Sequence, residues 1–156
     1  MEVLVYGTRG STPGQPRGST IYGGHTTCLR IKSDCLPQGM ALAIDAGSGF
    51  VDLSKDALKE GIKQMGIVFT HYHHDHTQGI FLAPHTFCAD AVTVWGPYEH
   101  GVGPQEVLAT LMRAPFFPVE FEKVAQRFHF KPLKHIGTQV LVFHPQGGSH
   151  LMPFNI

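Results

Sequence analysis

The stretch GIVFTHYHHDH, residues 66–76, places four histidines and one aspartate directly after a short apolar run. That run has the character of a strand buried on both faces, as in the parallel sheets of α/β proteins. His71 and His73 are two residues apart, so on an emerging strand their side chains project to the same side. Asp75 and His76 follow at the predicted start of a helix, where they can face the same point. The stretch therefore predicts polar ligands gathered at the C-terminal end of a strand, where α/β sheets place their sites.

These side chains suit a divalent metal ion. Imidazole nitrogens bind zinc at about 2.0–2.1 Å, and carboxylate oxygens bind at a similar range. Histidine combined with carboxylate favours zinc, with manganese or iron as alternatives. An exposed loop can carry several histidines by chance, but this group directly follows a buried strand. We therefore interpret the stretch as a metal site.

The rest of the chain alternates between strand and helix patterns, which predicts an α/β fold with a sheet at its centre. Its 156 residues suit a single domain, residues 1–156. The helix at 50–64 is predicted from apolar residues at helical spacing, with Ser48 as its N-cap. The pattern predicts further helices at 76–84 and 103–114, and strands at 2–7, 28–33, 40–46, 66–71, 91–97 and 138–144.

Composition narrows the class of partner and the compartment. The formal net charge is +0, which argues against general electrostatic capture of nucleic acid. The three cysteines, an odd number without short paired spacing, predict buried free thiols in a reducing compartment. The N-terminus does not resemble a signal peptide, and the sequence holds no apolar run of about 20 residues that could cross a bilayer. These features predict a cytoplasmic protein without a membrane partner.

The stretch THYHHDHTQG, residues 70–79, resembles the His-x-His-x-Asp-His signature of the metallo-β-lactamase superfamily, including the glycine that usually follows. The resemblance implies two pairs of metal ligands, His71 and His73 for a first ion and Asp75 and His76 for a second. It also implies a catalytic role for Asp75.

Two flanking segments extend the resemblance. LAIDAG, residues 42–47, is similar to the superfamily's earlier strand that ends in Asp-x-Gly, which implies that Asp45 supports the metal ligands from behind. The alternative for Asp45 is a carboxylate that caps a turn. VLVFHPQGGSH, residues 140–150, resembles a late strand whose histidine is the third ligand of the first metal. That ligand would be His144, with His150 as the competing candidate.

Weaker similarities point to one branch of the superfamily. GTRGSTP (7–13), YGGHTTC (22–28) and VTVWGP (92–97) are similar to the phosphodiesterase-like branch, which includes ribonuclease Z and the phosphoribosyl cyclic phosphodiesterases. The glycine-rich loop either brings backbone amides close to a phosphate or metal, or simply forms a tight turn. His25 is expected near the mouth of the site. His74 falls at a variable position without a role, and the other histidines, at 85, 100, 129 and 135, are expected on the surface or satisfied in the core.

The resemblance implies the N-terminal portion of a metallo-β-lactamase-type αββα sandwich. It also implies a metal-dependent hydrolase that cleaves a phosphodiester, small or RNA-like, by attack of a metal-bound hydroxide, with one or two zinc ions as cofactor. A bridging aspartate and a last histidine of the family pattern have no counterpart in this sequence, and Pro153 is expected to interrupt strand pairing.

Two alternatives stay open. The missing ligands favour a non-catalytic or metal-binding remnant of the fold. The signature is also shared across branches that hydrolyse thioesters or lactams, which makes such a hydrolase the other alternative. An incomplete sandwich should also expose an apolar sheet face. We therefore expect a homo-oligomer, or a partner chain that completes the site.

Overall fold

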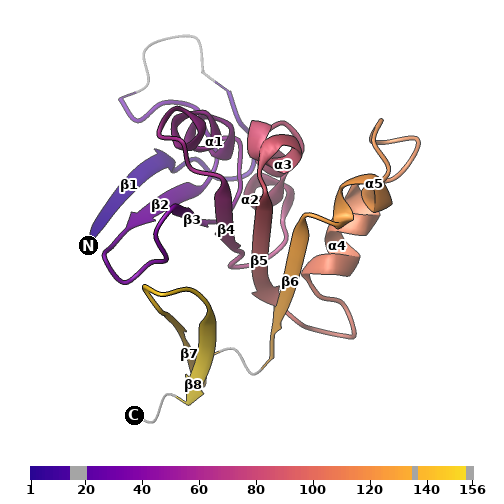
Figure 1. The fold of residues 1–156 in the computed structure, drawn as a ribbon. Coiled ribbons are helices and arrows are strands. Elements are labelled where there is room, and N and C mark those ends of the chain that lie inside the picture. The colour runs from indigo at the N-terminus through magenta and orange to yellow at the C-terminus, as the bar shows by residue number, and fades with distance from the viewer. Residues whose placement is uncertain (15–20, 135–136, 154–156) are drawn as a thin grey trace.

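A mixed six-stranded sheet forms the centre of the computed structural model, which describes residues 1–14, 21–134 and 137–153 (Figure 1). Its strand order is β1 (Glu2–Gly7), β2 (Cys28–Lys32), β3 (Met40–Ile44), β4 (Gln64–Val68), β5 (Ala91–Pro97), β6 (Phe128–Leu133). The first three strands pair antiparallel, and the strands from β3 to β6 pair parallel. A separate antiparallel hairpin follows, β7 (Gln139–Phe143) and β8 (Ser149–Pro153).

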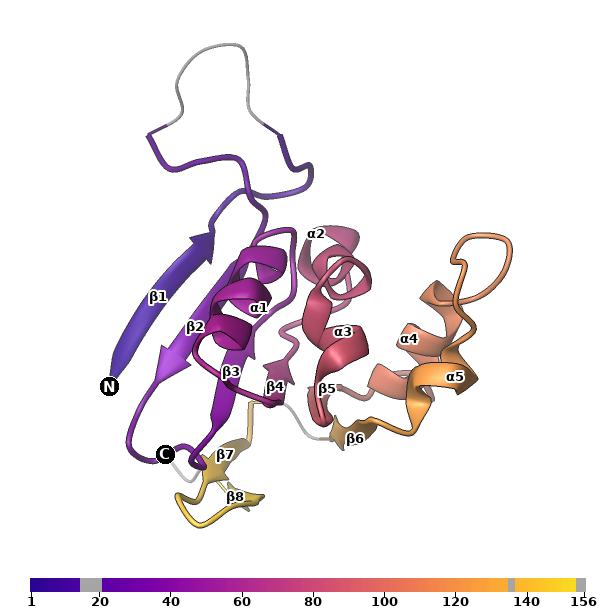
Figure 2. The ribbon, with the colours of Figure 1, turned by 45° about the horizontal axis from the view of Figure 1, so that its top comes forward.

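The helices gather on one side of the sheet, and the β7–β8 hairpin lies apart from them (Figure 2). They are α1 (Phe50–Lys59), α2 (His74–Thr77), the 3-10 helix η1 (Gln78–Phe81), α3 (Pro84–Cys88), α4 (Pro104–Leu111) and α5 (Phe121–Ala125). This confirms the predicted α/β class with a central sheet.

The main core lies between the sheet and these helices. Alternate residues of a strand point to opposite faces, and one set is fully buried: Ala41 and Ala43 on β3, Met65 and Ile67 on β4, Val92 and Val94 on β5. These side chains join one buried cluster with the apolar face of α1, which contributes Phe50, Leu53 and Ala57. Removal of this apolar surface from water is the principal force that holds the layers together.

Helix α1 is shorter than its pattern predicts, because it ends at Lys59 in a glycine-capped turn. Gly61 has φ +74, and its amide donates to the Leu58 carbonyl at 3.0 Å, while the Ile62 amide donates to Ala57 at 2.9 Å. This pair of bonds is a Schellman motif. The predicted N-cap is also wrong: Gly49 is the N-cap, and the helix has no side-chain cap.

Four elements were not predicted: α3, α5, β6 and β8. Strand β6 contains Pro132, which speaks against a strand in the sequence. Because β6 is at the edge of the sheet and pairs only with β5, a residue without an amide hydrogen is tolerated there. Pro153 is tolerated for a related reason: it is the last residue of β8 and pairs with Gln139, so the expected interruption does not occur.

The face of the sheet opposite the helices is only partly covered. Trp95 of β5 points to this side and contacts Phe143 of the hairpin, with ring centroids 5.2 Å apart. On β1, Val3 and Val5 remain 48% and 60% exposed. The predicted exposed apolar face is therefore present at this edge, and the oligomer inferred from it stays a prediction.

Two predictions from the composition can be compared with the structure: buried thiols, and the lack of a membrane span. Cys28 is buried, but Cys35 and Cys88 are exposed, so the expectation of buried thiols is wrong for those two. Within the described residues, no helix is long and apolar enough to cross a membrane.

Candidate metal centre

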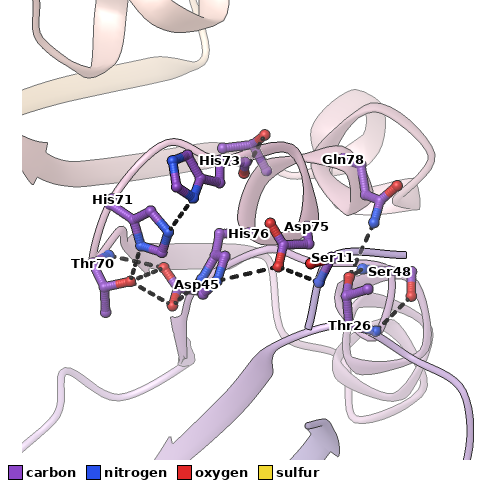
Figure 3. Close-up of polar contacts among 11 residues, drawn as sticks. Ser11, Thr26, Asp45, Ser48, Thr70, His71, His73, Asp75, His76 and Gln78 are labelled. Atoms are coloured by element: carbon purple, nitrogen blue, oxygen red, sulfur yellow. Dashed lines mark hydrogen bonds and ion pairs between the residues drawn. The ribbon is translucent and has the colours of Figure 1, made fainter. Parts of the chain in front are cut away.

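The histidine-rich segment, residues 70–76, follows β4 at the C-terminal edge of the parallel strands. Aromatic residues hold it in place: the Phe69 amide donates to the Trp95 carbonyl at 2.9 Å, and Phe69 is buried. Tyr72 packs edge-on against Phe69 and donates its hydroxyl hydrogen to the Pro97 carbonyl at 2.7 Å. Burial raises the pKa of Tyr72, so its hydroxyl stays protonated and keeps this bond. The histidines on either side of Tyr72 are thereby turned toward the candidate centre (Figure 3).

Asp45 lies behind the cluster and organises it. Its side chain is buried at the end of β3, and its backbone has φ +59, a conformation that aspartate tolerates better than most residues. One carboxylate oxygen accepts from the Thr70 amide at 2.8 Å, and the other contacts His76 Nδ1, also at 2.8 Å. The Thr70 hydroxyl donates to the same carboxylate at 2.8 Å. In this orientation the other ring nitrogen of His76 is directed away from Asp45, toward Asp75 (Figure 3).

His71 forms the centre of the histidine group. Its Nδ1 lies 3.0 Å from the Thr70 hydroxyl oxygen, and its Nε2 lies 3.0 Å from His73 Nδ1. The His76 ring lies close to it, tilted by 53°, with centroids 4.0 Å apart. Burial lowers the pKa of His71, and the neighbouring imidazoles of His76 and His73 lower it further. His71 is therefore held in the neutral form that a metal ligand requires.

Asp75 connects the cluster to the glycine-rich loop after β1. Its Oδ2 accepts a hydrogen bond from the Ser11 backbone amide at 2.7 Å and lies 3.6 Å from His76 Nε2. The bond from Ser11 is the main reason that the pKa of Asp75 lies below its ordinary value. Ser11 itself has φ +62. The loop therefore shows both predicted features: a tight turn, and a backbone amide close to a candidate metal ligand.

Two glycines allow the loops under the cluster to meet. The Ala46 amide donates to the His76 carbonyl at 2.7 Å, and the Gly79 amide donates to the Ala46 carbonyl at 2.8 Å. A Cβ atom on Gly79 would fall on the backbone carbonyl of Gly47, and one on Gly47 would fall on that of Asp75. Gly47 and Gly79 are therefore required at these positions, because the neighbouring backbone leaves no room for a Cβ atom.

The polar atoms fit metal ligands as two pairs. Ligand atoms that are each about 2.0–2.1 Å from a tetrahedral zinc ion lie about 3.4 Å from one another. His71 Nε2 and His73 Nδ1 are 3.0 Å apart, and Asp75 Oδ2 and His76 Nε2 are 3.6 Å apart. In the described ranges, no three or more His, Cys, Asp or Glu side chains are grouped so that they could hold one ion. The residues thus offer two half-sites.

The predicted third ligand lies elsewhere, on the β7–β8 hairpin. His144 Nε2 is 2.7 Å from His150 Nδ1, and the two rings stack with centroids 4.8 Å apart. The hairpin turn, with Gly147 and Gly148, lines a pocket together with Met40 and Gln64.

Met40 and Gln64 are the first residues of β3 and β4, at the opposite end of the strands from the histidine-rich segment. The structure therefore does not bring His144 or His150 to His71 and His73. The ligand role of His144 stays a prediction.

The remaining histidines separate into two kinds. His85 is a satisfied core residue, as predicted: its Nε2 lies 2.9 Å from the Ile62 carbonyl oxygen, and its Nδ1 lies 3.2 Å from the Ser54 hydroxyl. Exposed positions are taken by His25, His74, His100 and His129, and position 135 lies outside the described residues.

The sequence interpretation missed Thr70 and Ser11 as parts of the centre. Thr70 had a usable signal, because a hydroxyl residue at the end of a buried strand, directly before the ligands, needs a partner. Ser11 acts only through its backbone amide, so its side chain gave no such signal.

A pocket of about 430 Å³ opens beside His71 and His73. Its other wall comes from the end of β5 and the loop that follows, with Pro97, Glu99 and Val102. The candidate centre therefore borders a space of a size that small-molecule sites commonly have.

Comparisons with known proteins give relatives of this chain by sequence and by fold. No family model matches the chain. Over 130 residues, 80% of this chain, the sequence is 30% identical to ribonuclease Z from Clostridium acetobutylicum. Two crystal structures share the fold: a diphosphatase of the PhnP family, with TM-score 0.52 and 19% identity, and unliganded yeast PDE1, with TM-score 0.52 and 16% identity. Each alignment covers 90% of this chain.

The chain resembles the metallo-β-lactamase superfamily in sequence and shares its fold. It spans 37% of the length of the ribonuclease Z and 54% of each of the two solved structures. Among the parts of the metallo-β-lactamase fold that this chain holds are the helix-backed sheet and the loop with the His-x-His-x-Asp-His signature.

Proposed function

We propose that the protein is a metal-dependent hydrolase that cleaves phosphodiester bonds in a small or RNA-like substrate. The observation that carries this proposal is the pairing of His71 with His73 and of Asp75 with His76, on one edge of a metallo-β-lactamase sheet. Similarity to a ribonuclease Z supports a phosphodiester substrate. The fold shared with a diphosphatase supports the same general chemistry.

Each ligand pair would hold one divalent ion, with zinc preferred and manganese or iron as alternatives. His144 is proposed as the third ligand of the first ion, with His150 as its competitor. A bound ion supplies a Lewis acid that polarises a phosphoryl oxygen and lowers the pKa of water.

The chain's own residues prepare this chemistry. The Asp45 carboxylate fixes the ring of His76 through Nδ1 and so directs Nε2 toward Asp75. Such partners of a ligand set its orientation and increase its basicity. The Ser11 amide keeps Asp75 ionised, as a metal ligand or a proton acceptor must be. The pocket beside His71 and His73 gives the substrate a place next to both ligands.

A second candidate is a non-catalytic metal-binding or interaction module, a remnant of the fold. It is favoured by one observation: within the residues that the structure describes, the ligands form pairs, and no group of three converges. Catalytic zinc sites usually have three protein ligands and an open position. Metal content separates the candidates, because about two ions per chain supports the hydrolase and zero or one supports the module.

The direct test is hydrolysis of bis-p-nitrophenyl phosphate by protein loaded with zinc or manganese. We expect turnover that disappears with a chelator and in the His71→Ala and His73→Ala variants. His129→Ala is the matched control, because His129 is exposed on β6, away from the histidine-rich segment. Cleavage of a glutathione thioester in place of the phosphodiester would contradict the proposed substrate class. A protein that binds zinc tightly but cleaves neither compound would be the non-catalytic module.

A further inference from the structure

A second group of reactive side chains lies at the start of α1, outside the histidine-rich segment. His25 Nδ1 is 3.1 Å from the Ser48 hydroxyl oxygen, and His25 Nε2 is 3.3 Å from Asp52 Oδ2. The three residues come from the β1–β2 loop, the β3–α1 loop and the first turn of α1. A hydroxyl, an imidazole and a carboxylate in this order are the components of a nucleophile, its base and the group that orients the base.

Ser48 is held in place by Thr26. The Thr26 amide donates to the Ser48 hydroxyl oxygen at 2.9 Å, and the Ser48 amide donates to the Thr26 hydroxyl at 2.8 Å. Thr26 is fully buried and also accepts a hydrogen bond from the Gln78 side chain at 3.1 Å (Figure 3). Because the Ser48 oxygen accepts from Thr26, its own hydrogen is free to point to His25. Ser48 does not cap α1, so the hydroxyl has no competing role there.

His25 and Asp52 are also positioned by their neighbours. The Arg9 amide donates to the His25 carbonyl at 3.0 Å, which fixes the backbone of this loop. Lys55 binds the other oxygen of Asp52 at 3.0 Å and leaves Oδ2 directed at the imidazole. In the tautomer with hydrogen on Nε2, His25 donates to Asp52 and presents a free Nδ1 lone pair to Ser48.

Ser48 and His25 line a pocket of about 280 Å³. The rest of its wall comes from Pro13, Gly14, Gly23 and Gly24. These residues bring no charged side chain, and the charges around them have partners: Asp52 pairs with Lys55 at 3.0 Å, and the Arg9 guanidinium donates to the Gly14 carbonyl at 3.0 Å. The pocket suits a small, neutral, acyl-bearing molecule.

We propose that Ser48 is the nucleophile of a second, metal-independent hydrolytic site for small carboxylic esters. Ser48 Oγ attacks the carbonyl carbon while His25 Nδ1 takes the hydroxyl proton, and Asp52 stabilises the imidazolium through Nε2–H. The bond to the alkoxy oxygen then breaks, and His25 gives the proton to the leaving alcohol. Water hydrolyses the acyl-serine: His25 removes a proton from the water and returns it to Ser48 Oγ, and the carboxylic acid is released.

The test is labelling with a fluorophosphonate probe, which reacts with activated serine hydroxyls, in the presence of a chelator. We expect one label per chain, mapped to Ser48 by peptide mass spectrometry. Ser48→Ala should not be labelled, and His25→Gln and Asp52→Asn should slow labelling by about 100-fold and at least tenfold respectively. Ser33→Ala is the matched control, because Ser33 is in the β2–β3 turn. The chelator separates this test from that of the proposed phosphodiesterase.

Retention of fold is checked by circular dichroism for each variant. Because His25 and Asp52 are both exposed, their substitutions test the relay even where Ser48→Ala does not fold. A burst of p-nitrophenol from p-nitrophenyl acetate, equal to one per chain, would support the acyl-serine. Absence of label on Ser48, or labelling of the His25→Gln protein at the unchanged rate, would overturn the proposal.

Discussion

Two pairs of neighbouring histidines, His71 with His73 and His144 with His150, differ in what holds them. His71 and His73 follow a buried strand, and a buried aspartate, a threonine and two aromatic rings fix the segment that carries them. His144 and His150 are on a two-stranded hairpin and contact each other. Residue type therefore identifies a candidate ligand, but contacts with the core determine where that side chain is held.

The anchoring also differs in the backbone. Under the first pair, two loops pass so closely that only glycine fits at positions 47 and 79. In the hairpin, Gly147 and Gly148 have positive φ, but a Cβ atom on either would meet open space. At these glycines, the first region depends on close backbone contact and the second on a positive φ in its turn.

The largest expected effect comes from breaking that contact. Gly79→Ala should lower the free energy of unfolding by about 3 kcal/mol, because the new methyl group overlaps a backbone carbonyl that cannot move independently. Gly148→Ala should cost only about 1 kcal/mol, from the positive φ alone. Urea unfolding monitored by circular dichroism measures both. Equal losses would show that the two regions are equally tolerant.

Removing the buried charge behind the ligands should have the next largest effect. Asp45→Asn keeps the shape and the positive φ but weakens the bond to His76, so metal affinity should fall by about 10- to 100-fold. Asp90→Asn, at an exposed position, is the control. Isothermal titration with zinc gives both affinities. An unchanged affinity in Asp45→Asn would mean that the carboxylate only caps the turn.

The effect of the hairpin histidines on zinc binding can be measured directly. If His144 is the third ligand, His144→Ala should weaken zinc binding by about tenfold, roughly 1.4 kcal/mol, and His150→Ala should leave it nearly unchanged. The reverse order would assign the ligand to His150. Equal, negligible effects would mean that the hairpin pair does not take part, and that the two regions are independent in function as well as in anchoring.

The smallest expected effect is on the pH dependence of stability. Burial lowers the pKa of His85 below that of the unfolded chain, so the unfolded state binds more protons as the pH falls below about 6.5. Stability is therefore full above that pH and declines below it. His85→Gln should flatten this decline in thermal unfolding scans between pH 7 and pH 5, whereas His129→Gln should not. An unaltered slope in His85→Gln would assign the decline to other groups.

Local patterns were sufficient for most of the sheet and for the loop that carries the histidines. The strands at 2–7 and 91–97 match their predicted bounds, because alternation and apolar runs depend only on neighbouring residues. Strand β6 could not be predicted, because Pro132 is acceptable only at an edge, and edge position is a property of the whole sheet. The relay of Ser48, His25 and Asp52 depends likewise on loops that meet only in the folded chain.

The bond from the Ser11 amide to Asp75 joins positions 64 residues apart in sequence. It makes the arrangement of the Asp75–His76 pair dependent on the segment that follows β1 at the edge of the sheet. If this pair binds an ion, as proposed, the rate of ion uptake during refolding should report on assembly of that edge. A chain that begins at Met40 would keep every predicted ligand but would lack Ser11. In a stopped-flow refolding experiment, it should therefore lose the kinetic step in which the Ser11 amide binds Asp75.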